Sequence, residues 1–172
     1  MSADTDLHVL LAKQAISEVL DGYCRGLDRM DRDLALATWH DGGTADYGEL
    51  YSGTGAGFID WVFAQHAALA LHSHQITNRL IVIDGDRAAS EAYVTVTLLT
   101  DPDDMAVRLM TSYGRYVDRW AYRDGRWAVE HRRYVNDLTV SRELTAADLL
   151  AHSGGHRDSG DPSYANFDFE RR

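Results

Sequence analysis

The chain has 172 residues, 45% of them hydrophobic, and carries 27 acidic against 17 basic side chains, for a net charge of -10. This length suits one domain whose core is large enough to enclose a cavity. A strongly acidic surface repels phosphate groups, so we expect no nucleic acid among its partners. The single cysteine, Cys24, excludes an intrachain disulfide and favours a reducing compartment.

No segment approaches the ~20 apolar residues that a membrane helix needs. The N-terminal segment carries acidic residues where a signal peptide carries positive charge, and its apolar run ends at Lys13. We therefore expect a soluble, cytoplasmic protein with no membrane partner.

The first part of the chain predicts helices. Apolar residues recur three and four apart in the first thirty positions, which marks one face of an amphipathic helix. Asp31 is suited to cap a short second helix, and the Gly42-Gly43 pair should end that helix in a turn. The elements expected here are helices over 6–27, 32–39 and 58–72, with the sheet beginning near 44–47.

The rest of the chain predicts strands, because β-branched and aromatic residues alternate with short turn signals. These connections are too short for helical crossovers, so consecutive strands should be antiparallel neighbours in a curved sheet. The result is an α+β fold, with three N-terminal helices wrapped around one pocket. The strands are expected over 73–83, 87–100, 107–122 and 127–140 of a domain spanning 1–150. Residues 151–172 have linker composition and are expected to be mobile or docked on a neighbouring subunit.

Three segments carry a resemblance to a known family: Tyr-Cys-Arg-Gly-Leu-Asp at 23–28, His-Ser-His-Gln-Ile-Thr-Asn at 72–78, and Tyr-Arg-Asp-Gly-Arg-Trp at 122–127. Together they resemble the SnoaL-like branch of the nuclear transport factor 2-like superfamily, over roughly residues 8–140. The nearest group is that of scytalone dehydratase, hexachlorocyclohexane dehydrochlorinase and bile-acid 7α-dehydratase. The resemblance implies a cystatin-like, cone-shaped α+β barrel with one pocket, no metal and no organic cofactor.

The same resemblance implies roles for four residues. Asp28 matches the aspartate that orients the catalytic histidine, and His74 matches that histidine. Tyr23 matches a polar residue on the same helix, and Arg132 falls where two members of the group have an arginine. The chain departs from the dehydrochlorinase, which has lysine in place of Tyr23, and it offers no second catalytic histidine of the scytalone dehydratase kind.

The chemistry of these residues has alternatives. A carboxylate that accepts a hydrogen bond from one ring nitrogen makes the other nitrogen of His74 a base, but Asp28 could instead cap a turn and His74 be structural. The hydroxyl of Tyr23 could bind a substrate oxygen or a backbone group. Arg132 could polarise a substrate carbonyl, or it could lie on the surface paired with Glu130 or with an acid on a neighbouring strand.

Small and aromatic residues on one face of the strand over 107–122 are expected to line the pocket, with neighbours on the preceding strand beside them. Each could instead pack against a second subunit. The expected substrate-binding residues are Trp61, Tyr93, Thr95, Ser112, Gly114 and Tyr116.

A zinc site must be weighed, because His72 and His74 can point the same way on a strand and His131 could supply a third ligand. No cysteine pair and no His-Glu-x-x-His motif supports it, so we expect no metal.

We expect a cofactor-independent lyase of the dehydratase type, acting on a small, mostly apolar, ring-containing substrate. An isomerase or polyketide-type cyclase would use the same proton abstraction, and a non-catalytic ligand-binding or assembly module is a further alternative. A homo-oligomer, trimer or dimer, is expected through the outer sheet face, where Trp120, Tyr122 or Val129 would need cover.

Overall fold

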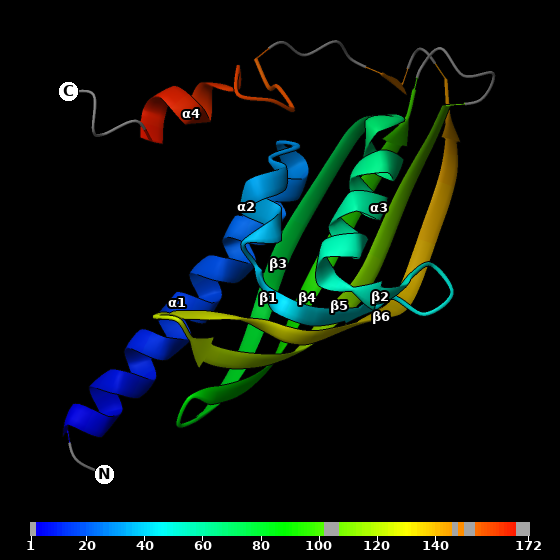
Figure 1. The fold of residues 1–172 in the computed structure, drawn as a ribbon. Helices are drawn as coiled ribbons and strands as arrows, with labels where there is room; N and C mark the ends of the chain where they lie inside the picture. Colours follow the sequence, from blue (N-terminus) through cyan, green and yellow to red (C-terminus); the bar gives the residue numbers. More distant parts are fainter. Residues whose placement is uncertain (1–2, 102–106, 146–147, 150–153, 168–172) are drawn as a thin grey trace.

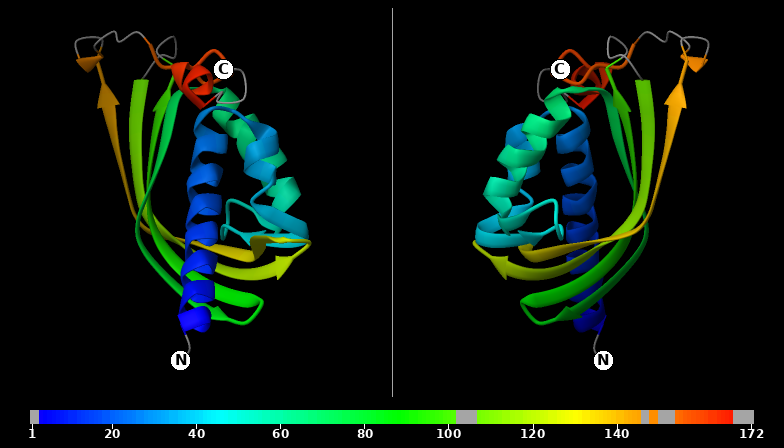
Figure 2. Two further views of the ribbon diagram at one scale, coloured as in Figure 1. Left: turned by 90° about the vertical axis from the view of Figure 1, so that its left-hand side faces the viewer. Right: turned by 90° about the vertical axis from the view of Figure 1, so that its right-hand side faces the viewer.

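A computed structural model describes residues 3–101, 107–145, 148–149 and 154–167. A strongly curved sheet carries three helices on its concave side, and a fourth, short helix lies near the C-terminus (Figures 1 and 2). The elements are α1 (Ala3–Asp28), α2 (Arg32–Leu36), β1 (Trp39–Asp46), β2 (Ser52–Thr54), α3 (Gly55–Ala67), β3 (Leu69–Asp84), β4 (Arg87–Thr100), β5 (Val107–Arg123), β6 (Arg126–Leu144) and α4 (Pro162–Phe167).

The helices begin where capping residues allow it. The carboxylate of Asp31 accepts a hydrogen bond from the backbone N–H of Leu34, 3.1 Å away, and starts α2. Thr54 caps α3 in the same way. None of the helices in the described ranges combines the length and the apolarity that crossing a membrane requires.

Two helix ends differ from the sequence prediction. Residue 39, expected to end the second helix, instead begins β1, and Gly42 and Gly43 lie inside this strand. Gly42 has a φ of 77°, and the pairing of β1 with β6 shifts between Trp39 and Thr44, so the glycines make an irregularity in the strand rather than a turn. The third helix ends at Ala67, because the residues that follow already pair in β3.

The sheet order is β2-β1-β6-β5-β4-β3, and the sheet is open at β3. The prediction that the last four strands are consecutive antiparallel neighbours is confirmed. β1 runs parallel to β6, and this pairing joins β1 and β2 to the sheet at the edge opposite β3.

A bulge in β6 decides which residues face inward. Trp120 pairs with Val129 and Arg119 pairs with His131, so Glu130 has no partner in the ladder. The extra residue resets the alternation, and Val129 and Arg132 both face the concave side although strict alternation would separate them.

The two faces of the sheet differ in burial. Trp120 and Val129, expected on the outer face, are 1% and 0% exposed and belong to the core, whereas Tyr122 is 43% exposed. The convex face carries other exposed apolar side chains, among them Leu80, Val82, Tyr93, Tyr113, Leu138 and Val140.

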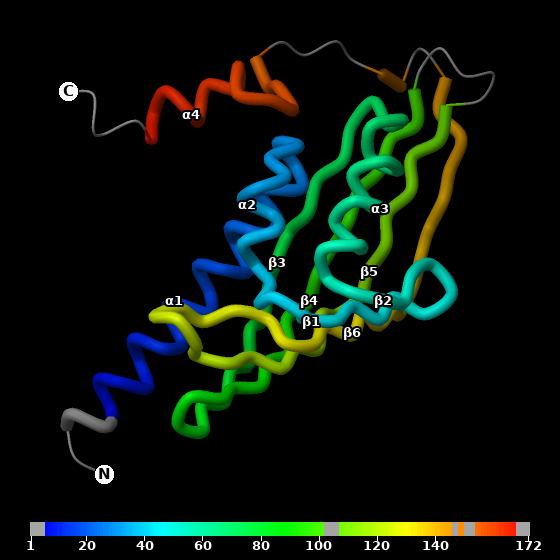
Figure 3. Tube along the Cα trace, viewed as in Figure 1, coloured from blue at the N-terminus to red at the C-terminus, as the bar shows by residue number. Residues whose placement is uncertain are grey.

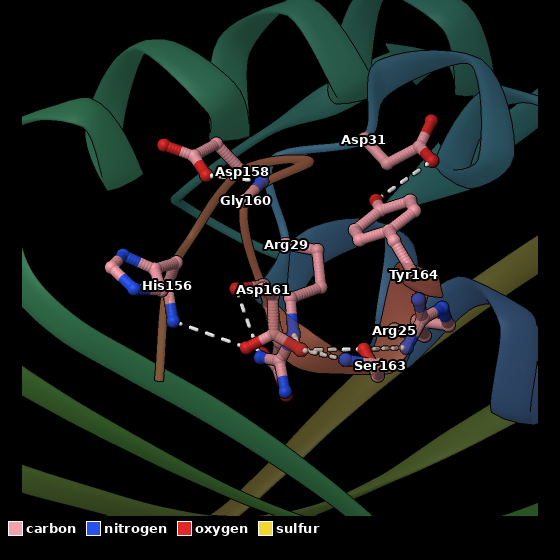
Figure 4. Close-up of polar contacts among 10 residues, drawn as sticks. Arg25, Arg29, Asp31, His156, Asp158, Gly160, Asp161, Ser163 and Tyr164 are labelled. Carbon is pink, nitrogen blue, oxygen red and sulfur yellow. Dashed lines mark hydrogen bonds and ion pairs between the residues drawn. The ribbon is translucent and has the colours of Figure 1, made fainter. Parts of the chain in front are cut away.

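The described part of the tail, 154–167, packs on its own chain. It lies over the end of α1, as the trace and the close-up show (Figures 3 and 4). Residues 150–153, where the tail leaves the domain, lie outside the described residues.

Candidate active site

The structure brings Asp28 and His74 together. Asp28 ends α1 and His74 lies in β3, and Oδ1 of Asp28 is 2.7 Å from Nδ1 of His74. The backbone N–H of His74 also donates to both carboxylate oxygens, at 3.1 and 3.0 Å. The side chains are 4% and 15% exposed for His74 and Asp28. Because an ionised carboxylate only accepts, it favours the tautomer with the proton on Nδ1 and leaves the lone pair on Nε2.

Two further histidines surround this pair. The ring of His66, from α3, stacks on His72 with centroids 4.2 Å apart and lies 5.5 Å from the ring of His74. Burial lowers the pKa of His66 to about 3 and also lowers the pKa of His72. Both rings are therefore neutral near pH 7 and place no positive charge beside His74.

A cavity of about 360 Å³ opens beside the pair, between α1, β3 and the tail. Asp28 and His74 line it together with Cys24, Ile76 and Phe167. Burial raises the pKa of the Cys24 thiol to about 12, so this cysteine is not a nucleophile at neutral pH. The wall also includes the charged side chains of Asp21, Arg25 and Arg29, so it is about as polar as it is apolar.

A second polar group lies deeper under the helices. Nε and Nη2 of Arg132 donate to Asp118 at 2.8 and 2.7 Å, and both side chains are 0% exposed. The guanidinium lies over the rings of Tyr23 and Tyr116, 4.4 and 4.1 Å from their centroids. Although burial alone would lower the pKa of Arg132, the Asp118 carboxylate raises it well above its usual range. Nη1 is buried and makes no hydrogen bond of ordinary geometry with any described residue.

Tyr47, which sequence reasoning missed, joins this group. Its hydroxyl is 3.1 Å from that of Tyr23, and its ring stacks on Phe58 at 3.9 Å. Burial raises the pKa of both tyrosines, so both hydroxyls keep their protons at neutral pH. An isolated tyrosine at a strand end gives no pattern by which it could have been found.

None of the six residues expected to bind substrate is among those that line the cavity beside Asp28 and His74. Trp61 lies on α3, and the other five divide between the two faces of the sheet. Directly opposite residues of an antiparallel pair share a face. Ser112 pairs with Val96 and Gly114 pairs with Val94, so these lie with Tyr116 on the concave side. His74 pairs with Val96 and therefore lies in one row with Ser112. Trp61 packs half-buried against Phe58 and Tyr51.

Tyr93 and Thr95 depart from the expectation that they lie beside Ser112. They pair with Arg115 and Tyr113, whose side chains belong to the convex face, and Tyr93 is 45% exposed. His131 is also on that face, where its Nδ1 is 2.8 Å from Thr44 Oγ1, so it does not meet His72 and His74. No group of three or more His, Cys, Asp or Glu side chains in the described ranges is placed to hold a metal ion.

Residues 8–133 match the family described as the SnoaL-like domain, and the chain belongs to this family. It is similar in structure to a putative scytalone dehydratase from Novosphingobium aromaticivorans, with 19% identity, a TM-score of 0.67, and coverage of 88% of this chain and 99% of the other. It is also similar to the hexachlorocyclohexane dehydrochlorinase LinA-type3 from Novosphingobium barchaimii, with 14% identity, a TM-score of 0.72, and coverage of 86% and 99%. At these identities the likeness shows the shared fold. No curated protein sequence matches the chain significantly.

Proposed function

We propose that the protein is a cofactor-independent lyase that removes a proton from carbon and expels water or another leaving group from a small, mostly apolar, ring-containing substrate. The observation that carries this proposal is the 2.7 Å contact between Asp28 and Nδ1 of His74 at the wall of a cavity. The contact leaves Nε2 of His74 as the base, in the tautomer that general-base catalysis needs.

In the proposed reaction Nε2 of His74 takes a proton from a carbon next to an electron-withdrawing group. The electron pair of the broken C–H bond forms a carbon–carbon double bond, and the leaving group departs from the next carbon with its own bonding pair. Asp28 stabilises the imidazolium that forms. The proton then passes to the leaving group or to solvent, so the enzyme returns to its starting state.

Two groups in the deeper cluster are suited to hold the substrate oxygen. Arg132 remains charged and has a buried Nη1 without a hydrogen bond of ordinary geometry to any described residue, and Tyr23 keeps its proton. Donors held rigidly in a buried site stabilise developing negative charge strongly. Neither Arg132 nor Tyr23 lines the cavity of Asp28 and His74, so this role requires the substrate to reach past the cavity wall into the buried cluster.

The test uses two ring ketones. With β-tetralone in D₂O, we expect catalysed exchange of the α-hydrogens for deuterium, which mass spectrometry measures. With the β-hydroxy derivative of α-tetralone, we expect loss of water to give α-naphthol, which is detected by its fluorescence. His74→Ala should slow both reactions by about 10²- to 10⁴-fold. His131→Ala, a histidine on the convex face, is the matched control and should react at the parent rate.

The outcomes separate the alternatives. Exchange without elimination would favour an isomerase or cyclase that starts with the same proton abstraction. Binding of both ketones with neither reaction would favour a ligand-binding module. Parent activity in His74→Ala would place the base elsewhere and refute the proposal.

A further inference from the structure

The tail reaches the histidine cluster through the side chain of Arg157. Its Nη1 lies 3.1 Å from Nδ1 of His72 and 3.0 Å from the carbonyl oxygen of His66. Residues 154–167 therefore contact the site directly, although the linker composition of this segment gives no sign of it.

Arg157 and the carbonyl group of Leu27 contact the two ring nitrogens of His72 and require the same tautomer. An arginine side chain only donates hydrogen bonds, so Nδ1 of His72 must accept and its ring proton must lie on Nε2. That proton is then available to the carbonyl oxygen of Leu27, 2.8 Å from Nε2. The other tautomer would set a lone pair of Nε2 against the carbonyl oxygen and a second N–H against the guanidinium.

The carbonyl that His72 holds belongs to the residue before Asp28. The last carbonyls of a helix lack intrahelical partners, and that of Leu27 accepts from His72 as well as from the backbone N–H of Met30. His72 and His74 share one face of β3, so one fixes the backbone at the end of α1 while the other contacts the carboxylate.

The tail is also anchored by contacts that do not involve Arg157 (Figure 4). Asp161 accepts from the backbone N–H groups of His156 and Ser163, both at 3.0 Å, and lies 3.3 Å from Nε of Arg29. Arg25 donates to the hydroxyl of Ser163 at 2.9 Å. These contacts hold the segment on the end of α1, so Arg157 is presented to His72 by a fixed backbone.

We propose that Arg157 is a positioning residue of the site, which holds the ring of His72 against the carbonyl oxygen of Leu27 and thereby fixes the helix end that carries Asp28. The proposal rests on the proposed function for its effect on rate, but its effect on His72 can be measured without a substrate.

The first measurement is NMR of the protein labelled with ¹⁵N in its histidines. In the parent, His72 should show a protonated Nε2 and an unprotonated Nδ1. In Arg157→Met the carbonyl group of Leu27 still requires the proton on Nε2, but with the ring held less firmly this proton should exchange faster with solvent and its resonance should move upfield. Burial lowers the pKa of His72 and the Arg157 charge lowers it further, so in this variant His72 should gain its second proton at higher pH. The other groups facing His72, namely His66, His74 and Asp28, are unchanged in this variant.

The second measurement is the pH profile of β-tetralone exchange. We expect kcat of Arg157→Met to fall about ten- to hundred-fold through misplacement of the pair, with KM changed much less. The acidic limb should move to higher pH as His72 becomes protonated. Arg157→Lys keeps a donor and should restore part of the rate, and Arg87→Met, an exposed arginine at the turn between β3 and β4, should behave like the parent.

An unchanged resonance position and exchange rate of the His72 Nε2 proton in Arg157→Met would overturn the proposal, whatever the rate of catalysis. The proposal would also be overturned if Arg157→Lys lost as much kcat as Arg157→Met while its His72 spectrum matched that of the parent. If Arg157→Met does not fold, the spectrum and pH profile of Arg157→Lys decide in the same way. If the parent itself shows no exchange, the proposed function fails while the NMR result still tests the role of Arg157.

Discussion

Replacing Asp118 by asparagine tests how strongly the buried ion pair depends on its surroundings. Asp118 and Arg132 are both 0% exposed and share two hydrogen bonds of 2.7 and 2.8 Å. In Asp118→Asn the guanidinium stays buried with no opposite charge, and the new amide N–H₂ group faces other donors. Breaking a buried pair in this way costs about 3–5 kcal/mol, which for a chain of this size lowers Tm by roughly 6–20 °C.

The chain supplies a matched control for this experiment. Arg115 and Asp137 form the same two-bonded pair, at 2.9 Å for each bond, but their side chains are 29% and 42% exposed. Asp137→Asn makes the same chemical change in a solvated pair, in which Arg115 also keeps its ion pair with Glu91, so it should cost much less. Urea unfolding at neutral pH measures both free energies. Equal losses in the two variants would refute the reasoning, because only in Asp118→Asn is a guanidinium left buried without a carboxylate partner among the described residues.

A double variant separates stability from function. Combining Asp118→Leu with Arg132→Met removes both charges together, which is often neutral or stabilising by about 1–4 kcal/mol. If Arg132 polarises the substrate, this variant should unfold at or above the parent denaturant midpoint and yet lose turnover of the β-hydroxy ketone. A stable and fully active double variant would remove Arg132 from the proposed mechanism.

Three further predictions concern the polar groups nearer the cavity. The pKa of His66 is about 3 in the folded chain, against an ordinary value of 6.5. Between these two pH values only the unfolded chain binds a proton on this residue. The free energy of unfolding should therefore fall by about 1.4 kcal/mol per pH unit as the pH drops through this range. In His66→Asn, urea unfolding at several pH values should show this slope reduced; an unchanged slope would contradict the burial of His66. His74→Ala and Asp28→Asn should each abolish single turnover with little change in Tm, and unfolding of His74→Ala would show that the histidine is structural. Tyr23→Phe should only weaken turnover, because a phenol contributes a graded electrostatic term, and a complete loss would make it the essential acid.

The sheet was largely predictable because its hairpins are short and strongly marked. Turn signals in the sequence bracket β4, and both its ends fall where the sequence predicts them. The β1 glycines and the β6 bulge were not predictable in this way. Nothing in the alternation of residues 127–134 reveals that Glu130 drops out of pairing, and the inward aim of Arg132 depends on that one residue.

The site was predictable only in part. Asp28 and His74 carry the family resemblance, and these two side chains do touch. Tyr93 and Thr95 were placed on the wrong face because sequence gives the strands but not the cross-strand register that decides which residues share a side. Arg157 could not be found, because a single guanidinium reaching a histidine from a polar tail leaves no periodicity or motif.

The register of the strands also determines which residues of the site lie together. The period of two in β3 sets His72 and His74 on one face, where both contact the end of α1. A slip of β3 by one residue would turn both rings to the convex face and free the helix end at the same time. Asp28 contacts both the backbone and the ring of His74, so its contacts depend on the position of the strand as well as on that of the base. The buried pair of Arg132 and Asp118 depends in the same way on the bulge in β6, so both halves of the site rest on where the strands pair.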